Sequence, residues 1–158
     1  MHRIYRETVI RSTPERCFDL SRSIDFHKES MSYSKEIPVA GRKTGLIELG
    51  EFVEWQATHL FIRQKLSSKI TEMVRPYYFV DEMVSGAFKS FIHRHEVRRI
   101  DKETVVLVDD FWYEAPLGIL GDIAIMLFLE RYMKRLFEIR SLAIKTVLET
   151  DEWKKYVT

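Results

Sequence analysis

The stretch PLGILGDIAIMLFLERYMKRLFEIRSLAIKTVLET, residues 116–150, decides the fold because it predicts one long helix near the end of the chain. We expect this helix to run from Leu117 to Glu149, about 50 Å at 1.5 Å per residue. Between Leu117 and Leu129 the only charged residue is Asp122, so this half is apolar on nearly every side. A helix that is apolar all round must be enclosed, and we expect the rest of the chain to enclose it.

Composition and charge bound the class of protein. The 158 residues are 46% hydrophobic and 31% charged, the balance of a globular domain with a sizeable core. A net charge of +1 argues against nucleic acid and anionic membranes as partners. The single Cys17 excludes an internal disulfide and indicates a reducing compartment. We expect a cytoplasmic protein without stable membrane insertion, since residues 117–129 are too short to span a bilayer. The sequence leaves open whether the chain forms a homodimer.

The order of elements predicts an α+β fold. Residues 2–11 predict a strand, and Thr13 and Pro14 suit the cap and first position of a helix that ends near Ser23. A second short helix is expected over Ile24–Met31. Alternating patterns and turn residues then predict successive antiparallel strands over 33–40, 51–58, 60–74, 77–85, 88–99 and 104–114. We expect a curved meander around the long helix, a single domain over residues 1–150, and a frayed tail over 151–158 unless Trp153 docks.

Alternation within each strand nominates an inner face that is apolar and aromatic with a few polar residues. The polar ones are His59, Asp81, His93, His95 and Asp109. Polar groups on a buried face need partners, because leaving one unpaired costs about 1–3 kcal/mol. Two readings remain open: these side chains satisfy one another, or they are the fixed polar groups of a mostly apolar ligand cavity.

Arg140 lies within the apolar stripe of the long helix, together with Met133 and Leu136. It can form a buried pair with Asp81 or Asp109, or it can offer its guanidinium to an acidic group of a ligand. No nucleophile–base pair is evident, so we assign no catalytic residue from the sequence. The predicted ligand-binding set is Trp55, Phe79, Asp81, Met83, Phe91, His93, His95, Asp109, Phe111, Tyr113, Met133, Leu136 and Arg140.

Metal binding is a separate hypothesis. His93-x-His95 places two imidazoles on one face of a strand, and Asp109 on the next strand is a candidate third ligand. No Cys-rich or His-rich run supports this hypothesis. We therefore predict no metal and no cofactor.

The chain resembles the START-like, or SRPBCC, superfamily, whose helix-grip fold has the same order of elements. Several local stretches are similar to its bacterial polyketide cyclase/dehydrase-like branch. These are Ser12-Thr13-Pro14-Glu15, Cys17-Phe18-Asp19, Val53-x-Trp55, Arg75-Pro76, Phe79-x-Asp81-x-Met83, Gly86-x-Phe88, Phe91-x-His93-x-His95 and Tyr113-x-x-Pro116-Leu117-Gly118.

The resemblance implies a deep apolar cavity between sheet and helix, which members use for lipids, polyketides, quinones and similar molecules. A non-catalytic binder or carrier of a small hydrophobic ligand is therefore the leading hypothesis. The first alternative is a cyclase or dehydratase that moves protons with cavity His and Asp side chains. The second is a protein-interaction module, which would have a filled interior and a large exposed apolar patch.

Overall fold

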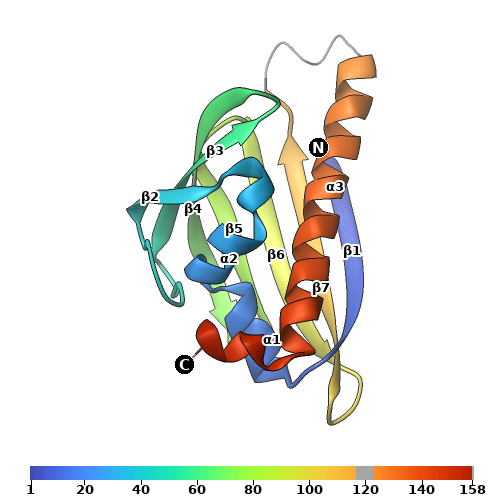
Figure 1. Ribbon diagram of the computed structural model, residues 1–158. Helices are drawn as coiled ribbons and strands as arrows, with labels where there is room; N and C mark the ends of the chain where they lie inside the picture. Colours follow the sequence, from blue (N-terminus) through green and yellow to red (C-terminus); the bar gives the residue numbers. More distant parts are fainter. Residues whose placement is uncertain (117–122, 158) are drawn as a thin grey trace.

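One curved antiparallel sheet and three α-helices form the molecule, and the computed structural model describes residues 1–116 and 123–157 (Figure 1). The predicted α+β architecture is confirmed. The sheet has the strand order β1-β7-β6-β5-β4-β3-β2. From β2 to β7 each strand pairs with the next strand in the chain, and the first strand, β1, pairs with the last, β7. The elements are β1 His2–Arg11, α1 Pro14–Ser21, α2 Ile24–Ser30, η1 Ser32–Ser34, β2 Ile37–Gly41, β3 Phe52–His59, β4 Ile62–Val74, β5 Tyr78–Ser85, β6 Ser90–Arg99, β7 Thr104–Glu114, α3 Ile123–Leu148 and η2 Asp151–Lys155.

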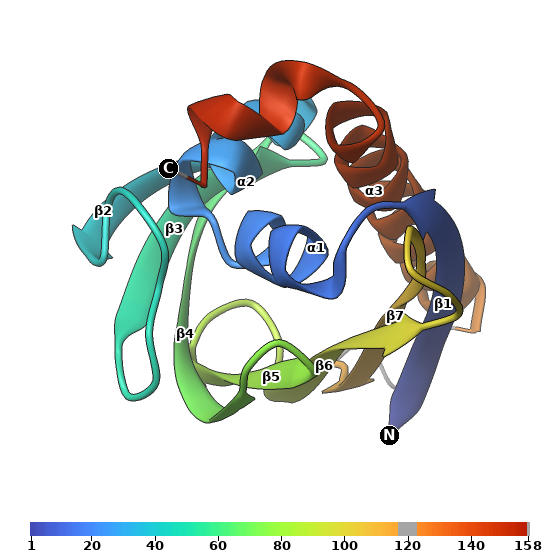
Figure 2. The same cartoon turned by 90° about the horizontal axis from the view of Figure 1, so that it is seen from below.

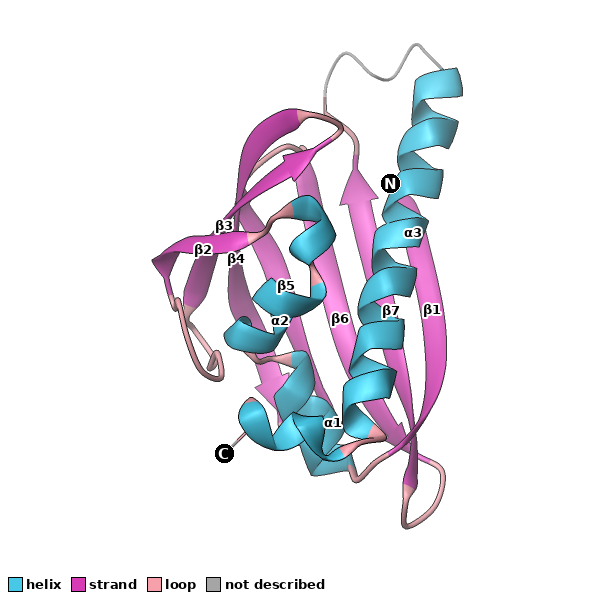
Figure 3. Ribbon diagram, viewed as in Figure 1, coloured by secondary structure: helices cyan, strands magenta, loops and turns pink. Residues whose placement is uncertain are grey.

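The sheet curls so far that the helices lie inside its concave face (Figures 2 and 3). Register shifts between Ser67 and Ser68 and between Ile70 and Glu72 interrupt the pairing of β4 with β5. Such bulges bend a strand and increase its twist. In the view of Figure 2 the strands surround α1, and α3 lies on the open side of the curve next to β1.

Local capping explains where the two short helices begin. The Thr13 hydroxyl accepts a hydrogen bond from the Arg16 amide, and Pro14 occupies the first helical position. The Ser23 hydroxyl accepts from the Phe26 amide in the same way, which starts α2 directly after α1. The Thr13 cap was predicted from the sequence because it is local, whereas the role of Ser23 as a cap was not predicted.

The predicted strand 33–40 is the largest local difference. Residues Ser32–Ser34 form a short 3₁₀ helix, and β2 begins only at Ile37. The Ser34 hydroxyl lies 2.8 Å from Glu36 Oε1 and 3.2 Å from the Met31 carbonyl, so its one hydrogen is held within this segment. Lys35 adopts the left-handed backbone conformation with φ 52°. Such local side-chain hydrogen bonds compete with strand pairing.

The apolar first half of the long helix was expected to be enclosed, but the described residues at the start of α3 are exposed. Ile123, Leu127 and Phe128 are 78%, 58% and 54% exposed. The first turns of α3 extend past the end of β1, so no strand lies beside them there (Figure 1). The predicted start at Leu117 and the charge of Asp122 lie outside the described residues. None of the described helices is long and apolar enough to cross a membrane.

The core consists of two apolar clusters with a layer of polar side chains between them. The larger cluster surrounds α1 and includes Val97 of β6 and Ile144 of α3. The smaller one includes Phe91 of β6 and Phe137 of α3. Because side chains of a strand alternate faces, the inward positions between Val97 and Phe91 belong to His95 and His93, and the polar layer is built into the strand pattern.

The C-terminal residues 151–157 pack on the domain, in contrast to the fraying expected for this tail. Trp153 and Tyr156 pack against the larger apolar cluster. The Tyr156 ring contacts Phe26 edge-on at 5.3 Å, and the Arg16 guanidinium lies 4.2 Å from the centre of the Trp153 ring. Trp153 therefore docks on the larger apolar cluster, which was the alternative to fraying that the sequence left open.

We predict that Ile144→Ala lowers the free energy of unfolding by about 2–5 kcal/mol, because it leaves a cavity in a close-packed core. Ile144 is 0% exposed, whereas Leu142 on the same helix is 48% exposed. Leu142→Ala is the matched control and should change stability by less than about 0.5 kcal/mol. Urea unfolding measures both values, and equal losses would contradict this assignment of the core face.

Candidate ligand-binding cavity

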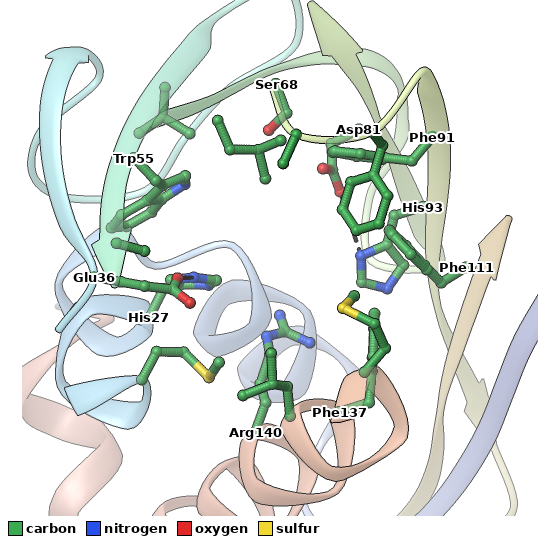
Figure 4. A pocket seen from close by; sticks show the side chains of 18 of the residues that line it. His27, Glu36, Trp55, Ser68, Asp81, Phe91, His93, Phe111, Phe137 and Arg140 are labelled. Carbon is green, nitrogen blue, oxygen red and sulfur yellow. Dashed lines mark hydrogen bonds and ion pairs between the residues drawn. The ribbon is translucent and has the colours of Figure 1, made fainter. Parts of the chain in front are cut away.

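A cavity of about 400 Å³ lies between the concave face of the sheet, α1, α2 and α3. Its size is that of a pocket for one small molecule. It extends from Ser21 at the end of α1 to Leu60 at the β3–β4 turn. Figure 4 shows His27, Glu36 and Trp55 on one wall and Asp81, His93 and Phe111 on the opposite wall.

Most of the predicted ligand-binding residues line this cavity. They are Trp55, Phe79, Asp81, Phe91, His93, His95, Phe111, Met133, Leu136 and Arg140. Three predicted residues do not line it. Met83 and Tyr113 pack in the smaller apolar cluster, and Asp109 lies behind the two histidines, where it is 1% exposed.

Sequence reasoning did not assign several other lining residues to the site. Among them are Ile24, His27, Met31, Glu36, Ser68 and Tyr132. The helical spacing of Ile24, His27 and Met31 was the available signal, since positions three and four apart share a helix face. No comparable signal marked Glu36, because the structure of 33–40 differs from the predicted strand.

Asp109 connects β7, β6 and α3 within the polar layer. Nη1 of Arg140 donates to Oδ1 of Asp109 at 3.1 Å, and Nη2 donates to the carbonyl of Ser21 at 3.0 Å. Nε2 of His93 lies 3.0 Å from the same oxygen. An ionised carboxylate only accepts hydrogen bonds, so Nε2 of His93 carries the hydrogen. The buried pair that the sequence allowed between Arg140 and Asp109 is thus present.

Asp81 and His95 form a second contact in this layer. Nε2 of His95 lies 2.8 Å from Oδ1 of Asp81, and Nδ1 of His93 lies 3.7 Å from that oxygen. The two imidazole rings are 3.6 Å apart between centroids, and Phe79 stacks on His95 at 4.2 Å. Nδ1 of His95 is buried and has no hydrogen-bond partner. The phenylalanine and the neighbouring imidazole restrict how the His95 ring can turn.

The pKa values of His93, Asp109 and Asp81 are all lowered, but burial causes the change for the histidine and hydrogen-bond partners cause it for the aspartates. Burial lowers the pKa of His93 to about 4, assisted by the neighbouring His95, so this imidazole is neutral near pH 7. For Asp109, burial alone would raise the pKa. The hydrogen bond from His93 and the charge of Arg140 outweigh it, and the pKa lies well below its usual value. The pKa of Asp81 is lowered for the same kind of reason, mainly by the hydrogen bond from His95.

The opposite wall holds a second histidine–carboxylate pair. Nε2 of His27 lies 2.6 Å from Oε2 of Glu36, and the His27 ring lies 4.4 Å from the Trp55 ring. Burial would raise the pKa of Glu36, but the charge and hydrogen bond of His27 and the Ser34 hydroxyl lower it. This wall therefore presents a fixed carboxylate and an aromatic face to the cavity.

A further polar contact connects the sheet to the long helix. Nδ1 of His59, at the end of β3, lies 2.9 Å from the hydroxyl of Tyr132 on α3. Both residues line the cavity. Leu60 and Phe128 border the same region and are about half exposed, so this end of the cavity adjoins solvent.

Asp81, His93 and His95 are also the trio of described residues that could hold a metal ion, with their ligand atoms within 4.8 Å of one another. The third ligand considered from the sequence was Asp109. The structure places Asp81 in that role instead, since Asp109 is engaged by Arg140 behind the histidines.

Comparison with known proteins identifies the fold. No protein-family model and no curated protein sequence matches the chain. Among solved structures, a START superfamily protein from Mycobacterium smegmatis has a TM-score of 0.67 at 10% identity, covering 94% of this chain and 98% of that one. A Thermus thermophilus protein has a TM-score of 0.66 at 14% identity, with 90% and 97% covered. A major latex-like protein from Panax ginseng has a TM-score of 0.64 at 13% identity, with 94% and 98% covered.

The chain therefore has the helix-grip fold of START-like proteins, as its sequence pattern predicted. The three neighbours cover 90–94% of this chain and match nearly their whole lengths. At these identities the comparison establishes the fold alone. The chemistry of the site has to be argued from the residues of this chain.

We predict that Glu36 contributes to stability above about pH 4.5 and that this contribution is lost on acidification. Because its pKa is lower in the folded state, the unfolded chain takes up the proton first as the pH falls. Glu36→Gln should therefore show a weaker loss of unfolding free energy than the wild type as the pH falls from about 5 to about 3. Glu72→Gln, an exposed control on β4, should keep the wild-type pH dependence. Identical urea-unfolding profiles for wild type and Glu36→Gln would contradict the assignment.

Proposed function

We propose that this protein binds and carries a small, mostly hydrophobic molecule in the cavity between sheet and α3. The observation that carries this proposal is the cavity of about 400 Å³ itself, since a packed core would leave no space of this size. Aromatic and aliphatic side chains supply most of its wall, among them Trp55, Phe79 and Leu136. A ligand held there would gain about 25 cal/mol for each Å² of apolar surface removed from water.

The polar groups of the cavity indicate the shape of such a ligand. Asp81 and His93 lie on one side, His27 and Glu36 lie on the other, and Arg140 of α3 lies between the two sides. The space between them is bordered by apolar side chains. A fitting ligand therefore has an apolar body and a polar group that reaches one of the two polar walls, the arrangement typical of small-molecule sites.

The interaction-module hypothesis fits less well. It requires a filled interior, and the cavity argues against that. Exposed apolar residues are present at Leu60, Phe61, Ile62 and the start of α3. Of these, Leu60 and Phe128 border the end of the cavity that adjoins solvent, where a ligand would enter.

We predict that Leu136→Phe weakens binding of an apolar fluorescent probe, anilinonaphthalene sulfonate, by about tenfold, or about 1.4 kcal/mol. The larger side chain would occupy space that the ligand needs, with little loss of stability. Ile144→Phe is the matched control on the same helix, buried outside the cavity. It should leave probe binding unchanged but lower the unfolding free energy by about 1–3 kcal/mol through overpacking.

Fluorescence titration and urea unfolding measure the two quantities. The proposal fails if the wild type shows no saturable probe binding and organic extraction of the purified protein recovers no small molecule. It also fails if Leu136→Phe behaves like Ile144→Phe, because that result would mean that Leu136 faces a packed core.

A cyclase or dehydratase activity is the second candidate function. The specific observation in its favour is that His93, His95, Asp81 and Asp109 converge within hydrogen-bonding distance beside the cavity. His95 with Asp81 resembles a general base held by a carboxylate, and such a pair contributes typically 10²–10⁴-fold to a rate, so about that much would be lost with it.

The test of this second candidate is turnover of a synthetic poly-β-ketone thioester. We expect the wild type to form a cyclised or dehydrated product, and His95→Gln to lose at least about 100-fold in rate while still binding the substrate. Product mass spectrometry follows the reaction. Equal rates for wild type, His95→Gln and buffer would exclude acid–base catalysis by this cluster.

A further inference from the structure

We infer that Asp81, His93 and His95 form a binding site for one divalent transition-metal ion in the wall of the cavity. The three residues come from two neighbouring strands, β5 and β6, and Asp81 lies directly opposite His93 in their register. Each offers one ligand atom, and these atoms lie within 4.8 Å of one another. Two histidines and one carboxylate are a common ligand set for such ions.

The separations of the ligand atoms suit one shared ion. Oδ1 of Asp81 lies 2.8 Å from Nε2 of His95 and 3.7 Å from Nδ1 of His93. An ion held at about 2.0–2.2 Å by each ligand in tetrahedral geometry would keep these atoms about 3.3–3.6 Å apart. The two separations from Asp81 are thus within about 0.5 Å of this range. The third, between the two imidazole nitrogens, is at most 4.8 Å and would shorten by rotation of the histidine side chains when an ion binds.

Asp109 already occupies the position of an outer-shell carboxylate. Nε2 of His93 lies 3.0 Å from its Oδ1, which leaves Nδ1 of His93 with a lone pair on the side of Asp81. Metal-binding histidines almost always donate their second ring N–H to a carboxylate, a carbonyl or water. Arg140 donates to the same carboxylate and compensates its charge.

The unpartnered atom of the cluster is explained by the same arrangement. Nδ1 of His95 is buried, has no hydrogen-bond partner and lies 3.4 Å from Oδ1 of Asp109. A metal bound to Nε2 of His95 requires the ring hydrogen to sit on Nδ1. That hydrogen would then be directed at Asp109, so both histidines would donate to one outer carboxylate.

The surroundings also favour a functional metal over a purely structural one. Phe79 stacks on His95 at 4.2 Å, and Phe137 contacts His93 edge-on at 5.1 Å, so apolar rings limit the movement of both ligands. Asp81, His93 and His95 all line the cavity. A coordination position is thus open toward a bound molecule, where the ion could polarise a carbonyl oxygen.

The ligand chemistry selects the class of ion. Imidazole nitrogens suit Zn²⁺, Fe²⁺, Ni²⁺ and Cu²⁺, whereas Mg²⁺ and Ca²⁺ prefer sites built from oxygen alone. This inference goes beyond carriage of an apolar ligand. Probe binding to metal-free protein tests the proposed function by itself, so either idea can fail while the other stands.

The test is titration of the chelator-stripped protein with Zn²⁺ by calorimetry, and with Co²⁺ by visible absorption. We expect saturation at one ion per chain and Co²⁺ bands of the intensity typical of four or five ligands. Asp81→Asn should weaken Zn²⁺ binding by more than about 100-fold, and Asp109→Asn by about 10–100-fold as a positioning residue. His27→Gln, which breaks the other histidine–carboxylate pair of the cavity, should keep the wild-type affinity.

Circular dichroism and thermal unfolding establish that each variant is folded. If Asp81→Asn does not fold, the Co²⁺ spectrum of the wild type and the Zn²⁺ affinity of Asp109→Asn still show whether an ion binds at this cluster. Absence of saturable Zn²⁺ and Co²⁺ binding to the wild type would overturn the inference. So would equal losses of affinity in Asp109→Asn and His27→Gln, since the ion would then lie elsewhere.

Discussion

The pairing of Asp109 with Arg140 is the interaction on which the interior of this protein depends. A carboxylate that is 1% exposed is very unfavourable unless it is paired and hydrogen-bonded. Arg140 meets this requirement from α3 and at the same time donates to the carbonyl of Ser21. One guanidinium thereby connects the last strand, the long helix and the end of α1, and it sets where α3 lies along the sheet.

This constraint also divides the interior into regions with different properties. On one side of the polar layer the larger cluster packs around Phe18 and Ile144, and on the other Phe91 packs with Phe137. Between them the polar side chains face the cavity and do not fill it. The apolar clusters supply cohesion, whereas the layer holds titratable groups in fixed positions beside a space where a ligand could lie.

The sequence predicted the inward faces of β3, β6 and β7 well, because alternation is a local property of extended backbone. The odd positions of β7, from Val105 to Tyr113, are buried, although Val108 on the even face is buried too. Prediction was weaker wherever a contact joins distant segments. The pair His59–Tyr132 brings together a strand end and a helix whose approach depends on the curvature of the whole sheet. The exposed start of α3 was also missed, since apolar periodicity does not report how far a helix extends beyond its sheet.

Local patterns predicted the order of elements, the cap of the first helix and the inner faces of β3, β6 and β7, and the resemblance to START-like proteins supplied the helix-grip fold. The sequence also placed His93, His95, Asp81, Asp109 and Arg140 in the interior. Their partners became known only from the packed structure: Arg140 and His93 pair with Asp109, and His95 pairs with Asp81. The physical reason is that these choices follow from strand register and from the position of α3 on the sheet. Both are properties of the packed chain, and no local stretch of sequence encodes either one alone.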